Sequence, residues 1–258
     1  MDLNLSSKSA LVCGSSQGIG LAAAQEIALL GANVTLLARN EQSLKLALTT
    51  LDTSQNQQHN LLVADFTDNQ AVRELVAESN QYNILVNNTG GPPGGQAIEA
   101  GEDEFLQAFS NHLINNQILA KAITPFMKSE EYGIIINIIS TSVKAPIPGL
   151  GVSNTIRGAV NSWSKTLANE LGQFGITVNN VLPGATSTVR LSSIIENKAN
   201  KLGKPATDVE NAMLAEIPAK RFADASEVAS AVAFLASPAA GYINGISIAV
   251  DGGRTGCL

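Results

Sequence analysis

Short apolar runs alternate along this chain with longer stretches in which apolar residues recur at helical spacing. That alternation is typical of strand–helix–strand units, which build a parallel sheet. The short runs predict about seven strands, at residues 9–13, 33–38, 60–63, 84–87, 134–139, 176–182 and 246–250. Helices are expected to begin near Ile19, Glu41, Asp68, Phe105, Ser153 and Ser226, and the region 190–217 is expected to be helical as well.

The fifth predicted strand indicates how the sheet is covered. Its sequence, Ile134-Ile135-Ile136 followed by Ile138-Ile139, is apolar at successive positions instead of alternating with polar residues. A parallel strand that is covered by helices on both faces has this pattern. The 258 residues show no long linker or repeat, so we predict one α/β domain over residues 1–258, a Rossmann-type doubly wound parallel sheet.

Composition and charge exclude several classes of partner. The formal net charge is −6 and the pI is near 5.0, without a basic stripe, which argues against nucleic-acid binding. No apolar run approaches the ~18 residues of a membrane span. Cys13 and Cys257 are the only cysteines, too few for a disulfide framework or a metal site. We therefore expect a cytoplasmic protein whose partners are small molecules and copies of itself.

A glycine-rich turn gives the first indication of function. The first predicted strand runs into Gly14-Ser15-Ser16-Gln17-Gly18-Ile19-Gly20 and then into a helix. In this context glycines let the backbone approach the pyrophosphate of a nucleotide at the helix N-terminus. The alternative is a tight structural turn. The strand, turn and helix at the start of the chain favour the nucleotide site.

Arg39 bears on which dinucleotide would bind. It lies 39 − 20 = 19 residues after the last glycine of the turn, at the end of the second predicted strand. An acidic residue at this place hydrogen-bonds the ribose of NAD, whereas an arginine accepts the 2′-phosphate of NADP. The neighbours Ala38 and Asn40 are not acidic, so NADP(H) is the predicted cofactor. A solvated surface arginine is the alternative.

Further motifs follow the later strands in a characteristic order. They are Asp65 after the third strand, Asn87-Asn88-Thr89-Gly90 after the fourth, Pro183-Gly184 with Thr188 after the sixth, and Val250-Asp251-Gly252-Gly253 near the C-terminus. With these motifs the chain resembles the classical short-chain dehydrogenase/reductase family over nearly its whole length, and the 3-oxoacyl-(acyl-carrier-protein) reductase branch in particular. The resemblance implies a homotetramer and a cofactor bound by Gly14, Ser16, Gln17, Gly18, Ile19, Gly20, Arg39, Asp65, Phe66, Asn88, Gly90, Arg157, Pro183, Gly184 and Thr188.

The catalytic positions of this family are altered in the chain. By resemblance, a tyrosine exchanges the proton with the substrate, and a lysine lowers the pKa of that tyrosine and holds the nicotinamide ribose. A serine orients the substrate carbonyl, and an asparagine supports a water relay. Ser140 matches the family serine. When the chain is aligned on Ser164-Lys165-Thr166-Leu167 and on residues 175–179, Ser153 stands at the tyrosine position and Arg157 at the lysine position. Counted back from Lys121, the asparagine position falls on His112.

These changes affect proton transfer most. Hydride addition to a carbonyl places negative charge on oxygen, which requires a nearby donor of suitable pKa. A serine hydroxyl is a far poorer acid than a phenol of pKa ~10, and an arginine fork is bulkier than an ammonium. The tyrosines Tyr82, Tyr132 and Tyr242 are not expected near the site.

His112 is the replacement that could supply a proton, because an imidazole titrates near neutrality. The favoured alternative is a helix-packing or subunit-contact histidine in a polar segment with Asn111, Asn115 and Asn116. Residues 90–95, Gly-Gly-Pro-Pro-Gly-Gly, either shape the substrate mouth or form a rigid loop. Lys198, Lys201 and Lys204 either meet an acidic carrier protein or phosphorylated substrate, or form a solvated helix face.

Two functional hypotheses follow. An oxidoreductase would move hydride to or from a carbonyl, alcohol or acyl thioester substrate, with Ser140 orienting the oxygen and Arg157 or a bound water stabilising it. A catalytically silent homologue would bind nucleotide for stability, sensing or partnership in an oligomer. The oxidoreductase is slightly favoured because the glycine turn and Ser140 are intact. A rate change around pH ~6.5 would indicate a histidine-driven enzyme.

Overall fold

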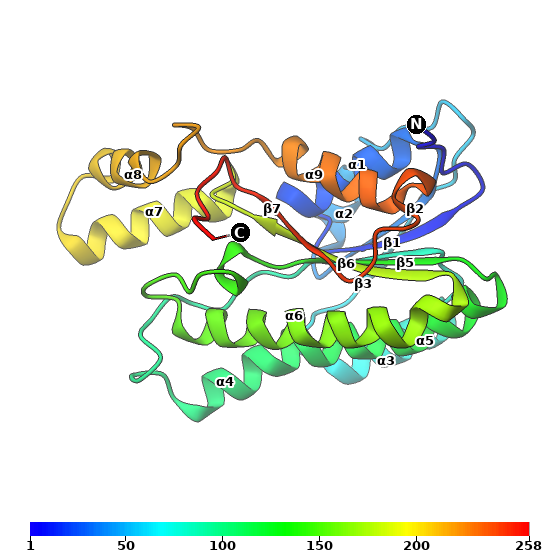
Figure 1. The fold of residues 1–258 in the computed structure, drawn as a ribbon, viewed down its shortest axis with the longest axis horizontal. Helices are drawn as coiled ribbons and strands as arrows, with labels where there is room; N and C mark the ends of the chain where they lie inside the picture. Colours follow the sequence, from blue (N-terminus) through cyan, green and yellow to red (C-terminus); the bar gives the residue numbers. More distant parts are fainter. Residues whose placement is uncertain (258) are drawn as a thin grey trace.

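The computed structural model describes residues 1–257 and consists of a parallel sheet with helices on both faces (Figure 1). The sheet has seven strands in the order β3-β2-β1-β4-β5-β6-β7. The strands are β1 Ser9–Cys13, β2 Asn33–Ala38, β3 Asn60–Val63, β4 Ile84–Asn87, β5 Gly133–Ile138, β6 Ile176–Pro183 and β7 Ser247–Val250. The helices are α1 Gly18–Leu29, α2 Glu41–Leu48, α3 Asn69–Glu78, α4 Glu102–Phe109, α5 Asn115–Ser129, α6 Gly151–Leu171, α7 Val189–Leu202, α8 Ala206–Ala215 and α9 Ala225–Ala236.

The predicted doubly wound sheet is confirmed, and its first four strands have the predicted bounds. The later boundaries shift by one residue: β5 ends at Ile138, β6 extends to Pro183, and β7 begins at Ser247. The helix expected from Phe105 begins earlier and is divided, because a π-helical turn at Ser110–Ile114 joins α4 to α5. Helix α6 begins at Gly151, two residues before the expected Ser153. Within residues 1–257, no helix is long and apolar enough to cross a membrane.

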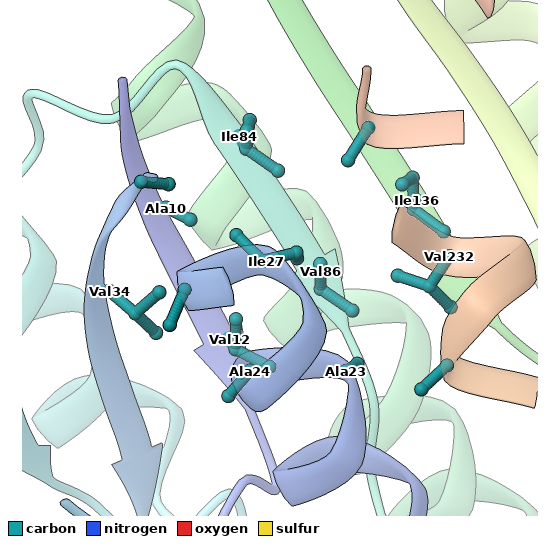
Figure 2. Packing of buried hydrophobic residues seen from close by; sticks show 14 of the residues in the cluster. Ala10, Val12, Ala23, Ala24, Ile27, Val34, Ile84, Val86, Ile136 and Val232 are labelled. Carbon is teal, nitrogen blue, oxygen red and sulfur yellow. The ribbon is translucent and has the colours of Figure 1, made fainter. Parts of the chain in front are cut away.

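Two apolar layers hold the helices against the sheet, as the continuous apolar strands predict. Strand β5 is buried at every position. Ile134 and Ile136 pack in the layer that contains α1, α2 and α9, and Ile135 packs in the opposite layer with α3, α5 and α6. Figure 2 shows the first layer, where Ile27 of α1 lies over the strands and Val232 of α9 lies beside Ile136. Alternate side chains therefore point to opposite faces of the sheet, and helices bury both faces.

The strand order places a crevice in the middle of the sheet. Strand β1 pairs with β2 on one side and with β4 on the other, so the chain reverses its winding direction between β1 and β4. In doubly wound folds, ligands bind outside the carboxyl ends of the strands at this switch point. Here those ends are followed by Gly14 after β1 and Asn88 after β4.

Candidate active site

A cleft of about 1160 Å³ opens at the switch point. Its walls come from the turn after β1, the ends of β2, β3 and β4, and the starts of α7 and α8. Of the predicted cofactor-binding residues, the following line it: Gly14, Ser16, Gln17, Gly18, Ile19, Arg39, Asp65, Phe66, Asn88, Gly90 and Thr188. Residues from the glycine turn and from the segments that follow β2, β3, β4 and β6 thus meet in one cavity.

The glycine turn is held by close backbone packing. Gly14 has a φ of 58°, and a Cβ built on it would lie 2.6 Å from the carbonyl oxygen of Asn88. A Cβ on Gly20 would lie 2.2 Å from the carbonyl oxygen of Gly14. The Asn88 amide donates to the same Gly14 oxygen at 3.2 Å. Side chains at either glycine would therefore separate the turn from Asn88.

The first turn of α1 is suited to an anion. Its N-cap residue Gln17 is extended and makes no side-chain capping hydrogen bond. The first backbone N–H groups of a helix have no partner within the helix, and they carry the positive end of the helix dipole. Ser16, Gly18 and Ile19 line the cleft beside them. Ser15, by contrast, is buried, donates to the Val12 carbonyl at 2.8 Å and accepts from Leu37 N–H at 3.0 Å.

Three predicted cofactor-binding glycine and proline positions lie outside the lining of the cleft: Gly20, Pro183 and Gly184. Gly184 is placed by packing, since a Cβ on it would lie 2.7 Å from Cα of Asp251. Its N–H donates to the Val250 carbonyl at 2.9 Å. The absence of a side chain thus lets Gly20 pack against Gly14 and Asn88, and Gly184 against Asp251. Arg157, the fourth predicted residue outside the lining, is buried in α6.

Arg157 and Arg190 converge at the inner part of this region. A Cβ built on Gly91 would lie 2.7 Å from Nη2 of Arg190 and 3.4 Å from Nη2 of Arg157. Arg157 is 9% exposed and donates through Nη1 to the carbonyl of Ile138 at 3.2 Å. His112, 3% exposed in the π-helical turn, is hydrogen-bonded through Nδ1 to the hydroxyl of Thr89. The structure therefore groups two of the predicted catalytic residues with a second arginine.

The predicted catalytic serines, Ser140 and Ser153, are not among the residues that line the cleft. Ser140 directly follows Ile139 beyond β5 and is half-buried, and its Oγ accepts from the N–H of Ser142 at 3.1 Å. Ser153 is half-buried in the first turn of α6. The three tyrosines lie elsewhere, as expected. Tyr82 is buried and pairs with Ser79, Tyr132 precedes β5, and Tyr242 is fully exposed.

Comparison with known proteins decides the family. Residues 14–255 match the family model described as enoyl-(acyl carrier protein) reductase. The 3-oxoacyl-(acyl-carrier-protein) reductase of Haemophilus influenzae is 33% identical over 251 residues, which cover 95% of this chain and 97% of that protein. The chain belongs to the short-chain dehydrogenase/reductase family.

Solved structures of the short-chain dehydrogenase/reductase fold superpose closely. L-sorbose reductase from Gluconobacter frateurii, in complex with NADPH and L-sorbose, has a TM-score of 0.92 and 29% identity, with 100% of both chains covered. YwfH, an NADPH-dependent reductase involved in bacilysin biosynthesis, has a TM-score of 0.91 and 27% identity, covering 98% of this chain and 100% of that one. The predicted family and its reductase branch are thereby confirmed.

The surroundings of His112 disfavour a role as proton donor. Burial, followed by the charges of Arg157 and Arg190, lowers the pKa of His112 to about 3. The imidazole is therefore neutral at pH 7, and the expectation that it titrates near neutrality is corrected. The sequence could not indicate this, because the two arginines are distant from His112 along the chain and burial is a tertiary property.

The pKa of His112 predicts a pH-dependent stability. Below its usual pKa of 6.5 the unfolded chain binds a proton that the folded chain takes up only near pH 3, so stability falls as pH drops through this interval. As the pH is lowered from 7.5 to 5.5, we expect the free energy of unfolding of His112→Asn to rise by about 1 kcal/mol relative to that of the wild type. Urea unfolding of both proteins at the two pH values measures this. His59 is common to both, and parallel pH dependences would contradict the expectation.

Arg190 was given no role from the sequence, and Thr89 and Gly91 were named only as parts of the motif and the loop after the fourth strand. Thr89 and Gly91 flank the predicted Gly90, and Arg190 follows the predicted Thr188 by two residues. Their places next to predicted residues were a signal. What the sequence lacked was any indication that α7 and the loop after β4 approach one another, which is shown by Arg190 Nη2 at 3.5 Å from the carbonyl of Pro92.

Proposed function

We propose that the protein is an NADP(H)-dependent oxidoreductase that acts on a carbonyl or alcohol group of a small molecule, with an altered catalytic centre. The observation that carries this proposal is the single cleft that joins the uncapped start of α1, Arg39 and Asn88. The 3-oxoacyl reductase relative and the NADPH complex of L-sorbose reductase support the same reaction class. By family resemblance we also propose a cytoplasmic homotetramer.

The residues of the cleft fit the parts of such a cofactor. The backbone N–H groups at the start of α1 would hold the pyrophosphate, and the exposed Arg39 would pair with the 2′-phosphate. Asp65, whose pKa is lowered mainly by the N–H of Thr67, stays ionised for an adenine amino group. When bound, the nicotinamide supplies or accepts the hydride.

Ser140 and Arg157 would act on the substrate oxygen in different ways, Ser140 as a hydrogen-bond donor and Arg157 as a positive charge. Because the Ser142 N–H occupies a lone pair of Ser140 Oγ, the Ser140 hydroxyl hydrogen is directed elsewhere and would be donated to the substrate oxygen. Burial, with a smaller contribution from Arg190, lowers the pKa of Arg157 to about 10, so it remains cationic at neutral pH. That charge would stabilise negative charge that develops on the oxygen. Ser153 is too weak an acid to replace the family phenol.

The test is single-turnover loss of NADPH absorbance with a panel of ketones, keto acids and 3-oxoacyl thioesters, beside calorimetric NADPH binding. We expect at least one compound of the panel to oxidise NADPH. The absence of NADPH binding would overturn the cofactor assignment.

A catalytically silent nucleotide-binding protein is the second candidate. It is favoured by the positions of the tyrosines, since among residues 1–257 none lies in the lining of the cleft. This candidate predicts tight NADPH binding with no turnover across the panel. Its role would then be sensing, stability or partnership in an oligomer.

Arg39→Asp tests the choice of cofactor. The variant replaces the partner of a 2′-phosphate with a carboxylate that repels it and hydrogen-bonds a free ribose. NADPH binding should weaken roughly 10- to 100-fold, the loss of one charge-assisted contact, while NADH binding improves. Calorimetry with both nucleotides measures the ratio. Arg73→Gln, an exposed arginine on α3, is a control for general charge effects. Equal loss of both nucleotides would contradict the assignment.

A further inference from the structure

Two guanidinium groups meet at the backbone of Gly91, and among residues 1–257 neither forms an ion pair with an acidic side chain. They come from distant elements, Arg157 from the second turn of α6 and Arg190 from the start of α7. Both Nη2 atoms approach the same Cβ position on Gly91, at 3.4 Å and 2.7 Å. The hydrogen bonds they make are to the carbonyls of Ile138 and Pro92, which carry no charge.

Within the part of the chain that the structure describes, no carboxylate balances the charges of this pair. Within residues 1–257 the ion pairs are Lys45–Glu41, Arg221–Glu227 and Arg254–Glu216, none of which involves either arginine. The carboxylates that line the cleft, Asp65, Glu196 and Glu210, form no ion pair with them. His112 adds no negative charge, because its imidazole is neutral and its hydrogen-bond partner is the uncharged hydroxyl of Thr89.

A buried cation that lacks a partner is costly, and two neighbouring cations repel each other as well. The mutual effect is visible in Arg157, whose pKa is lowered first by burial and then by the charge of Arg190. An anion held between the two forks would relieve both costs. Guanidinium groups match the planar, two-oxygen geometry of a carboxylate, and each can donate two parallel hydrogen bonds to it.

We propose that Arg157 and Arg190 bind a free carboxylate of the substrate, so that the protein acts on an oxo acid or hydroxy acid and not on a neutral acyl thioester. This inference rests on the proposed function and specifies its substrate class. Gly91 allows it, since a side chain there would occupy the space between the two guanidinium groups. Arg190 is the solvent-exposed member and would receive the carboxylate first, while the buried Arg157 donates to the carbonyl of Ile138 at the end of β5.

The proposal is tested by calorimetry on protein saturated with NADP⁺, a state that cannot reduce an oxo acid. The probes are acetoacetate, 2-oxobutanoate and phenylpyruvate, each compared with its methyl ester. We expect at least one acid to bind at least roughly tenfold more tightly than its ester, the range of a charge-assisted hydrogen bond. Arg190→Gln should weaken acid binding roughly 10- to 100-fold and leave ester binding unchanged. Arg190→Lys should recover part of the loss, because it restores the charge without the fork.

Arg73→Gln serves as the matched control, because it removes the same charge from the surface of α3 and should change nothing. Equal binding of acids and esters, or no binding of any acid, would overturn the proposal. So would a loss of NADP⁺ affinity in Arg190→Gln, which would assign the arginine to a cofactor phosphate. Repeating the titrations on cofactor-free protein separates this outcome from failure of the proposed function, since NADP⁺ binding and acid binding are then measured independently.

Discussion

Replacing Ser140 with alanine is expected to lower kcat/KM for any substrate of this protein roughly 100- to 1000-fold, with NADPH binding unchanged. The reason is the position of the hydroxyl at the end of β5, where the N–H of Ser142 occupies a lone pair of Ser140 Oγ at 3.1 Å. The hydroxyl hydrogen is then available to the substrate oxygen, and it strengthens its bond as negative charge develops there. In the proposed site, which lacks a phenol, this neutral donor would carry a larger share of the stabilisation.

Ser142→Ala is the matched control for this variant. The Ser142 hydroxyl is buried and has no hydrogen-bond partner within residues 1–257, and its N–H stays in place after the substitution. Turnover should be unchanged, and stability should stay the same or rise by up to about 1 kcal/mol, because a buried unpaired hydroxyl is removed. Single-turnover rates, NADPH titrations and urea unfolding are measured for both variants. Similar rates for Ser140→Ala and the wild type would remove Ser140 from the catalytic centre.

The second large effect is expected at Gly20. In Gly20→Ala the new Cβ would lie 2.2 Å from the Gly14 carbonyl oxygen and 2.6 Å from Nδ2 of Asn88. Neither neighbour can withdraw easily, because one is backbone and the other holds that backbone by hydrogen bonds to Cys13 and Gly14. We expect a loss of about 3 kcal/mol in the free energy of unfolding, the upper range for overpacking. NADPH affinity should fall with it, because the displaced turn contains the N–H groups that we propose bind the pyrophosphate.

Gly158→Ala provides the opposite control, since a Cβ at this position on α6 meets nothing within 4 Å. Alanine should stabilise this helix by about 0.5–1 kcal/mol through its higher helix propensity. Urea unfolding at one fixed protein concentration compares the two variants, because self-association would make stability depend on concentration. A Gly20→Ala protein as stable as the wild type would show that the turn can relax, and would contradict the packing argument.

The local sequence determined the secondary structure and the order of motifs. Buried parallel strands have nearly continuous apolar runs, so β1, β2 and β4 could be placed to the residue from the sequence. The edge strand β3 has no buried position, and its short apolar run was placed to the residue as well. The division of the expected helix near Phe105 was not predictable, because a π-helical turn changes the hydrogen-bonding pattern without a distinct composition. A polar row inside the sheet was also hidden. Asn87, Asn137, Asn180 and Ser247 stand in register on four neighbouring strands and are joined by side-chain hydrogen bonds of 2.9, 3.0 and 3.1 Å.

The sequence by itself determined the family, the doubly wound sheet and eleven of the residues that line the cleft, because these depend on local patterns and on motifs that recur with fixed spacing. Only the tertiary structure decided which charged and titratable side chains lie together around Gly91. It brought Arg190 to Arg157 across Gly91 and placed His112 where burial and both charges keep it neutral. The physical reason is that burial and electrostatic interactions depend on distances between side chains, and residues far apart in the chain acquire those distances only on folding.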